Sequence, residues 1–90
     1  MSNELLELTN LGKTSVQWLN AVGIRTFEQL RNTGPAAIYY KVRERGFKAS
    51  KVFLYALEGA LNNTHWNNFT RDEKASLLEK VSVIEKHNEI

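Results

Sequence analysis

Four of the five glycines in this 90-residue chain lie about eleven residues apart, at Gly12, Gly23, Gly34 and Gly46. Each follows a short run of apolar residues with the three- and four-residue spacing of an amphipathic helix. Because glycine readily adopts the left-handed backbone conformation that ends helices, this spacing indicates repeated helix stops. No stretch of the sequence alternates apolar and polar residues for the length of a strand. The sequence therefore predicts an all-α fold, a compact bundle of five to six short helices.

Local start and stop signals predict where these helices lie. They place helices over residues 3–9, 14–21, 27–32, 35–45, 51–62 and 71–87. The residues expected to cap helix N-termini are Thr14, Thr26, Ser50 and Thr70. Each of the three threonines is followed three positions later by glutamine or glutamate, the spacing of a capping box. Pro35 follows Gly34 at a first helical position, where its missing N–H is tolerated.

The apolar side chains at helical spacing define the expected core. They are Leu5, Leu6, Leu8, Val16, Leu19, Phe27, Leu30, Ile38, Val42, Phe53, Leu57, Ala60, Leu61, Leu77, Leu78, Val81 and Ile84, with Trp18 left open. Gly59 interrupts one helix at a cost of about 1 kcal/mol relative to alanine, so another helix is expected to pack closely there. Because 90 residues cannot build a second core, we expect one domain over residues 1–90, with its core over about 5–86.

Composition excludes several classes of protein. The chain has no cysteine, which removes disulfides and thiolate metal sites. Its start lacks a signal peptide, and no apolar run approaches the roughly 20 residues of a membrane span, so a cytoplasmic location is expected. His65 and His87 are too few for a metal site, and we expect no metal and no cofactor. His65-Trp66 is expected to pack a loop against the core. Glu58, beside Gly59, is expected to be partly buried and paired with an arginine or with backbone N–H groups.

Positive charge is concentrated in the middle of the chain. Residues 11–57 contain eight basic and two acidic residues, whereas the whole chain has a net charge of only +2. Such a distribution is typical of a surface that faces a polyanion, although a solvated surface with scattered cations explains it as well. Five of the basic residues lie within residues 41–51, around the Gly46 turn.

Two segments of the first half have the same pattern of residues. Both 8–16 and 19–27 contain a leucine, an apolar residue beside a glycine, and then a basic residue close to a threonine. A glycine turn followed by a helix start leaves free backbone N–H groups, which attract anions together with the helix dipole. This is the physical basis of phosphate binding by helix-hairpin-helix modules, which contact the backbone of nucleic acids without reading bases.

The first segment resembles a helix-hairpin-helix turn, with Thr9 in place of the usual proline and Asn10 in place of the first glycine. Asparagine tolerates the left-handed conformation, so the turn can survive, but close approach to a phosphate is less favoured. The run 22–30 resembles the C-terminal domain of the bacterial RNA polymerase alpha subunit. Residues 5–79, and above all Leu57-Glu58-Gly59-Ala60-Leu61 followed by His65-Trp66, resemble the C-terminal domain of TfoX (Sxy) competence regulators. The resemblance implies a helix-hairpin-helix-like N-terminal half and a link to DNA or transcription. The TfoX N-terminal domain is expected to be absent from this chain.

Two functions follow as hypotheses, and neither is enzymatic, because no catalytic constellation is present in the sequence. The first is sequence-independent binding of nucleic acid phosphates by Lys13, Thr14, Ser15, Arg25, Lys41, Arg43, Arg45, Lys48 and Lys51. The second is interaction with a protein, such as a regulator, a polymerase subunit or a second copy in a weak homodimer, through exposed aromatic side chains. The candidates for that contact are Trp18, Tyr39, Tyr40 and Trp66.

Overall fold

Residues 4–87 are described by the computed structural model, and within that range the chain contains helices and no strand. In chain order these are the 3-10 helix η1 (Glu4–Glu7), α1 (Lys13–Ala21), α2 (Phe27–Thr33), α3 (Pro35–Glu44), α4 (Lys51–Asn62), the 3-10 helix η2 (Trp66–Asn68) and α5 (Arg71–His87). The predicted all-α class is confirmed. The first predicted helix is a single 3-10 turn, because Asn10 already turns the chain with a φ of 75°.

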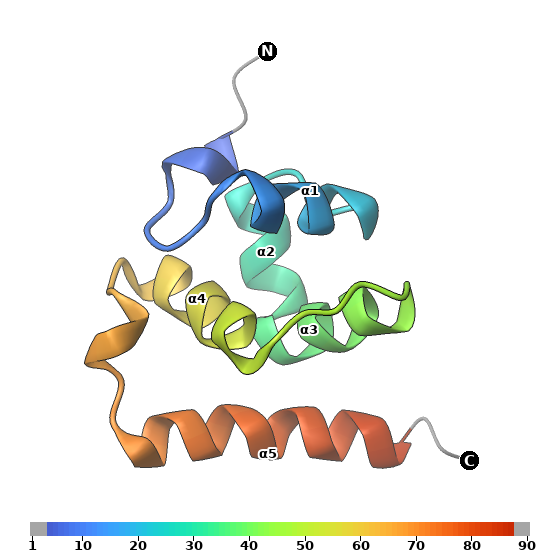
Figure 1. Cartoon of the computed structure of the whole chain (residues 1–90), viewed down its shortest axis with the longest axis vertical. Coiled ribbons are helices and arrows are strands. Elements are labelled where there is room, and N and C mark those ends of the chain that lie inside the picture. Colours follow the sequence, from blue (N-terminus) through green and yellow to red (C-terminus); the bar gives the residue numbers. More distant parts are fainter. Residues whose placement is uncertain (1–3, 88–90) are drawn as a thin grey trace.

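Helix α3 contacts most of the other helices, since α1, α2, α4 and α5 all pack on it (Figure 1). Helix α5 lies along one edge of the molecule, mainly against α3, while η1 and α1 lie at the opposite end. The loop with η2 connects α4 to α5 and remains in contact with α4. Helix α4 lies between α1 and α5 in this view (Figure 1).

The core is centred on α4. Its five consecutive residues 53–57 are buried, which occurs only when a helix is enclosed on several sides. The side chains with the least exposure come from η1 and from four of the α-helices. They are Leu5, Leu19, Leu30, Ile38, Val42, Leu54 and Leu57. Leu6, in the single turn of η1, is 45% exposed. Five other residues of the expected core are half-buried, namely Leu8, Phe27, Leu61, Leu78 and Ile84.

Two of the predicted capping boxes are present. In α2, Thr26 Oγ1 accepts a hydrogen bond from Gln29 N at 3.1 Å, and Gln29 Oε1 accepts one from Thr26 N at 3.2 Å. The same reciprocal pair joins Thr70 and Glu73 at the start of α5. The prediction for Thr14 is wrong, because α1 begins at Lys13, and Gly12, two positions before Thr14, occupies the N-cap position. Ser50 occupies the N-cap position of α4, but its side chain makes no capping hydrogen bond.

Asn10 joins the first turn to the loop after α4. Its side-chain amide donates to the Thr64 carbonyl at 2.9 Å, and its Oδ1 accepts from Trp66 N at 3.4 Å. A Cβ on Gly59 would overlap both the Asn10 amide and the Thr64 carbonyl oxygen. Gly59 is therefore required by a close approach, as predicted, but the neighbour is this hydrogen-bonded loop rather than another helix. Asn10, which departs from the helix-hairpin-helix pattern, acts here as a long-range clamp.

Candidate functional site

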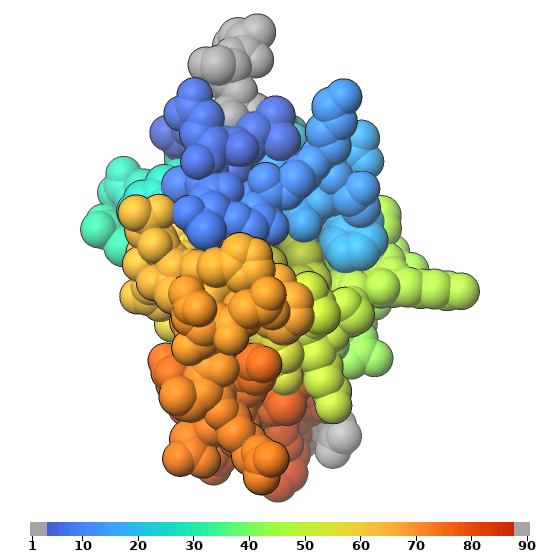
Figure 2. Space-filling model, turned by 60° about the vertical axis from the view of Figure 1, so that its left-hand side comes forward, coloured from blue at the N-terminus to red at the C-terminus, as the bar shows by residue number. Residues whose placement is uncertain are grey.

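A groove of about 360 Å³ lies between the first turns of α1 and α4 and the η2 loop. Its lining combines hydroxyl, amide, aromatic and small aliphatic side chains. They are Asn10, Thr14, Ser15, Trp18, Ser50, Val52, Phe53, Ala56, His65 and Trp66. Figure 2 shows the segments that form it side by side on one face: the blue start of α1, the yellow-green segment leading into α4, and the orange η2 loop. This groove, called the α1–α4 groove below, brings together residues that lie about 50 positions apart in the sequence.

The two helices that begin at this groove have uncapped N-termini, as does α3. Neither α1 nor α4 has a side-chain cap or an acidic residue in its first turn, and each begins with a lysine. By contrast, α2 and α5 have capping boxes together with Glu28, or Asp72 and Glu73, in their first turns. Because a helix N-terminus carries a partial positive charge, a lysine there is unfavourable unless an anion compensates. In α1 and α4 this positive charge is not offset by an acidic residue of the same first turn.

Three of the predicted cations flank the α1–α4 groove. Lys13 and Lys51 are the first residues of α1 and α4, next to the lining residues Thr14 and Ser50, and Lys48 lies in the loop leading into α4. All three lysines are exposed. Of the predicted residues, Thr14 and Ser15 line the groove, and Lys13, Lys48 and Lys51 lie within two sequence positions of the lining residues Thr14 or Ser50.

Aromatic rings form the walls of the groove. The Trp18 ring meets the Phe53 ring edge-on, with centroids 5.1 Å apart, and lies 6.0 Å from the Phe47 ring. Trp66 stacks between Tyr55 and His65, at centroid distances of 6.3 and 6.1 Å. The expectation that Trp18 and Trp66 are exposed is wrong, because both are half-buried against the core. The packing expected of His65-Trp66 holds for Trp66, whereas His65 is exposed.

Arg25 lies outside this site, at the start of α2. The backbone amides around it are already occupied: Gln29 Oε1 accepts from Arg25 N at 2.7 Å, and Glu4 Oε1 accepts from Phe27 N at 3.1 Å. A phosphate would have to displace both side chains. The Gly23 turn therefore shares the sequence pattern of the Gly12 turn, but the backbone N–H groups at the start of the helix after it are already hydrogen-bonded.

The remaining predicted cations lie along the second half of α3. Lys41 and Arg45 line a hollow of about 410 Å³ with Val22, Tyr40 and Glu44. The Arg43 guanidinium lies 5.5 Å from the centre of the Tyr39 ring and donates to its hydroxyl at 3.4 Å. Tyr39 is only 4% exposed, so its assignment as an exposed interaction residue is wrong. Tyr40 is half-buried. The nine predicted nucleic-acid residues therefore do not form one continuous patch.

Four lining residues were not predicted as site residues, namely Ser50, Val52, Phe53 and His65. A signal was present, since α1 and α4 both begin with lysine and lack an early acid, but no local pattern reveals that their starts meet. Within residues 4–87, no helix is long and apolar enough to cross a membrane, and no group of three or more potential ligands is placed to hold a metal ion.

Comparisons with known proteins identify the family of this fold. The family model described as the TfoX C-terminal domain matches residues 1–81. A crystal structure of an uncharacterized protein from Listeria monocytogenes, in a triclinic form, is 31% identical with a TM-score of 0.79, and the match covers 90% of this chain and 92% of that one. A tetragonal-form structure of a Listeria monocytogenes protein of unknown function is 29% identical with a TM-score of 0.78, covering 88% and 98% of the two chains. No curated protein matches.

Proposed function

This chain belongs to the TfoX C-terminal domain family, and we propose that it is a non-enzymatic module that binds the phosphate backbone of nucleic acids at the α1–α4 groove. A link to transcription or competence regulation, and a cytoplasmic location, belong to the same proposal. The partner would be DNA, held by phosphate contacts and not by base recognition.

The observation that carries this proposal is the meeting of two uncapped helix N-termini at one groove. Each α-helix start offers backbone N–H groups and a partial positive charge of about half an elementary charge. Lys13 and Lys51 raise the local positive charge at the same two points, where acidic residues would stabilise the free protein better. An anion in the groove would compensate the partial charges of both helix N-termini and the charges of both lysines. A role in folding alone would favour acidic residues there.

The aromatic walls favour a nucleic acid over a simple inorganic anion. The exposed Lys48, in the loop leading into α4, adds a further positive charge for a neighbouring phosphate of the same strand. The exposed His65 ring, which stacks on Trp66, offers a face for a base or a sugar beside the phosphate contacts. Because phosphate contacts release counterions, we expect affinity to fall steeply as salt rises.

The test is a fluorescence anisotropy titration of a short duplex DNA at salt concentrations between about 50 and 200 mM. The variant combining Lys13→Ala, Lys48→Ala and Lys51→Ala should reduce the slope of log K against log salt by about 2 to 3, close to one unit per lost phosphate contact. The matched control combines Lys41→Ala, Arg45→Ala and Lys86→Ala, which removes the same charge elsewhere. Equal losses in both variants would show a general effect of net charge and contradict the site. No binding at low salt would contradict the function.

A further inference from the structure

A second groove runs along α5, on the edge of the molecule away from η1 and α1. It consists of two hollows, of about 190 and 380 Å³, that share Glu58, Leu77 and Lys80 in their linings. The two hollows therefore adjoin at these three residues, which belong to α4 and α5. Together they are called the α5 groove below.

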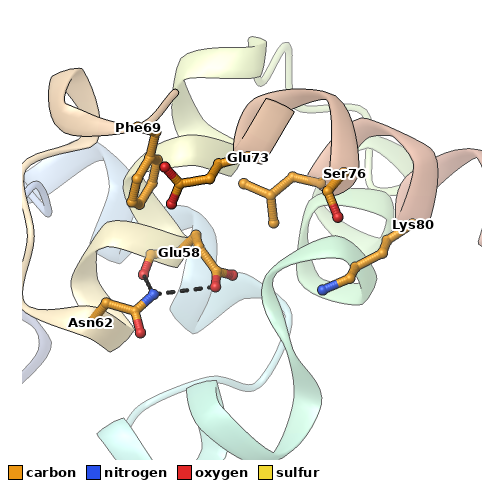
Figure 3. A pocket seen from close by; sticks show the side chains of 7 residues that line it. Glu58, Asn62, Phe69, Glu73, Ser76 and Lys80 are labelled. Atoms are coloured by element: carbon orange, nitrogen blue, oxygen red, sulfur yellow. Dashed lines mark hydrogen bonds between the residues drawn. The ribbon is translucent and has the colours of Figure 1, made fainter. Parts of the chain in front are cut away.

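One end of the α5 groove is polar and acidic. Figure 3 shows Glu58 and Asn62 of α4 facing Glu73, Ser76 and Lys80 of α5 across this end. The Glu58 carboxylate is half-buried and accepts a hydrogen bond from the Asn62 side-chain amide at 3.2 Å. The predicted arginine or backbone partner of Glu58 is therefore wrong, and the partner is a neutral amide. A carboxylate partly removed from water with only a neutral partner gains most from an added cation.

The other end of the α5 groove is apolar. Its lining includes Pro35, Ala36 and Ala37 at the start of α3, with Val83 and Ile84 from the last turns of α5. Val83 is 61% exposed, the highest value among the large apolar side chains of residues 4–87. One exposed valine is ordinary on a protein surface. Here, however, Val83 lines the same hollow as the apolar residues of α3 and α5. An aliphatic side chain placed on this surface would be removed from water, which is favourable.

We propose that the α5 groove docks an amphipathic helical segment of a protein partner, with an aliphatic side chain at the Pro35–Val83 end and an arginine or lysine at Glu58. The charge complementarity rests on Glu58, which lines both hollows, so a cation bound there lies beside the apolar end. Seven residues of α5 separate Leu77 from Ile84, which corresponds to about 10 Å of helix. A partner helix lying along α5 spans the same distance between its positions i and i+7.

This site is separate from the proposed phosphate site in both position and charge. The α1–α4 groove is flanked by three lysines, whereas the polar end of the α5 groove contains two carboxylates and one lysine. Carboxylates repel a phosphate backbone, so the same nucleic acid would not occupy both grooves. A chain with both grooves could hold a protein partner while it binds DNA.

The test uses a fluorescein-labelled helical peptide of about 16 residues with leucines at i and i+3 and an arginine at i+7. A second peptide has glutamate in place of the arginine, and a third has the same residues in scrambled order. Anisotropy should show binding of the first peptide and at least about fivefold weaker binding of the other two. Equal binding of the arginine and glutamate peptides, or no binding at concentrations of about 1 mM, would overturn the proposal.

Variants of the protein locate the contact. Glu58→Gln, which retains the Asn62 contact, should weaken the arginine peptide about fivefold, and Val83→Lys should weaken it about tenfold. The matched controls Glu79→Gln and Leu6→Lys change an exposed acid on α5 and an exposed apolar residue elsewhere, and both should leave affinity unchanged within about twofold. Equal losses in the controls would overturn the assignment. So would a solution mass of two chains that Val83→Lys reduces to one, because a second copy would then occupy the groove.

Discussion

The close approach of the Asn10 loop to Gly59 predicts that alanine at this position is destabilising, although helix propensity favours alanine over glycine. Gly59 lies inside α4, where alanine is usually more stable than glycine by about 1 kcal/mol. In this structure the added Cβ would overlap the Asn10 amide and the Thr64 carbonyl oxygen. Overpacking of this kind costs about 1 to 3 kcal/mol, and losing the two hydrogen bonds of Asn10 costs about 1 kcal/mol each.

After subtracting the gain in propensity, Gly59→Ala should lower the free energy of unfolding by about 2 to 4 kcal/mol. For a domain of this size the melting temperature should fall by about 8 °C or more, measured by circular dichroism with a denaturant titration as a second measure. Asn10→Gly removes one of the two obstacles, so Gly59→Ala should be less destabilising in that background, with a coupling energy of at least about 0.5 kcal/mol. A Gly59→Ala variant as stable as the wild type, or more so, would refute the reasoning.

Three further predictions follow from capping and burial. Thr70→Ala removes the cap of α5 and should cost about 1 kcal/mol, whereas Thr14→Ala, which removes no cap, should change stability by less than about 0.5 kcal/mol in the same thermal melts. Gly12→Ser gives α1 a side-chain cap, because Gly12 is extended and has free space around it. Stability should rise by a few tenths of a kcal/mol, and DNA affinity should fall because the serine occupies a backbone N–H of the first turn. A gain in affinity would contradict the binding of phosphate by the backbone N–H groups of α1. Leu54→Ala should cost about 2 to 5 kcal/mol in urea denaturation, and Val83→Ala less than about 0.5 kcal/mol; similar values would contradict the core assignment.

Much of the secondary structure could be predicted because its signals are local. The bounds of α4 and α5 match the predicted ranges 51–62 and 71–87, and α2 and α3 differ from prediction by one residue each. Glycine stops, Pro35 and the two capping boxes act within a few residues of the helix ends they define. The prediction that Thr14 caps α1 was wrong because Gly12 occupies the N-cap position instead. The spacing of residues alone does not show which residue takes that position.

The site could be predicted only in part, because it depends on contacts between distant segments. Lys13 and Lys51 were both candidates, but the sequence does not show that α1 and α4 begin at one groove. Asn10 was treated as a weakened hairpin residue, whereas it bonds to Thr64 and Trp66, more than 50 positions away. Arg25 lies outside the proposed site for a similar reason, since Glu4 Oε1, 23 positions from Phe27, accepts from the Phe27 N–H at the start of α2.

The central claim is that the first turns of α1 and α4 together hold phosphate groups. The most direct measurement is a two-dimensional amide NMR titration of the labelled protein with short duplex DNA at low salt. The account predicts that the largest shifts fall on the backbone amides of Thr14, Ser15, Lys51 and Val52, and that they reverse as salt is raised. Shifts centred on the Arg25 turn or on Lys41 and Arg45, with the α1 and α4 starts unchanged, would contradict it.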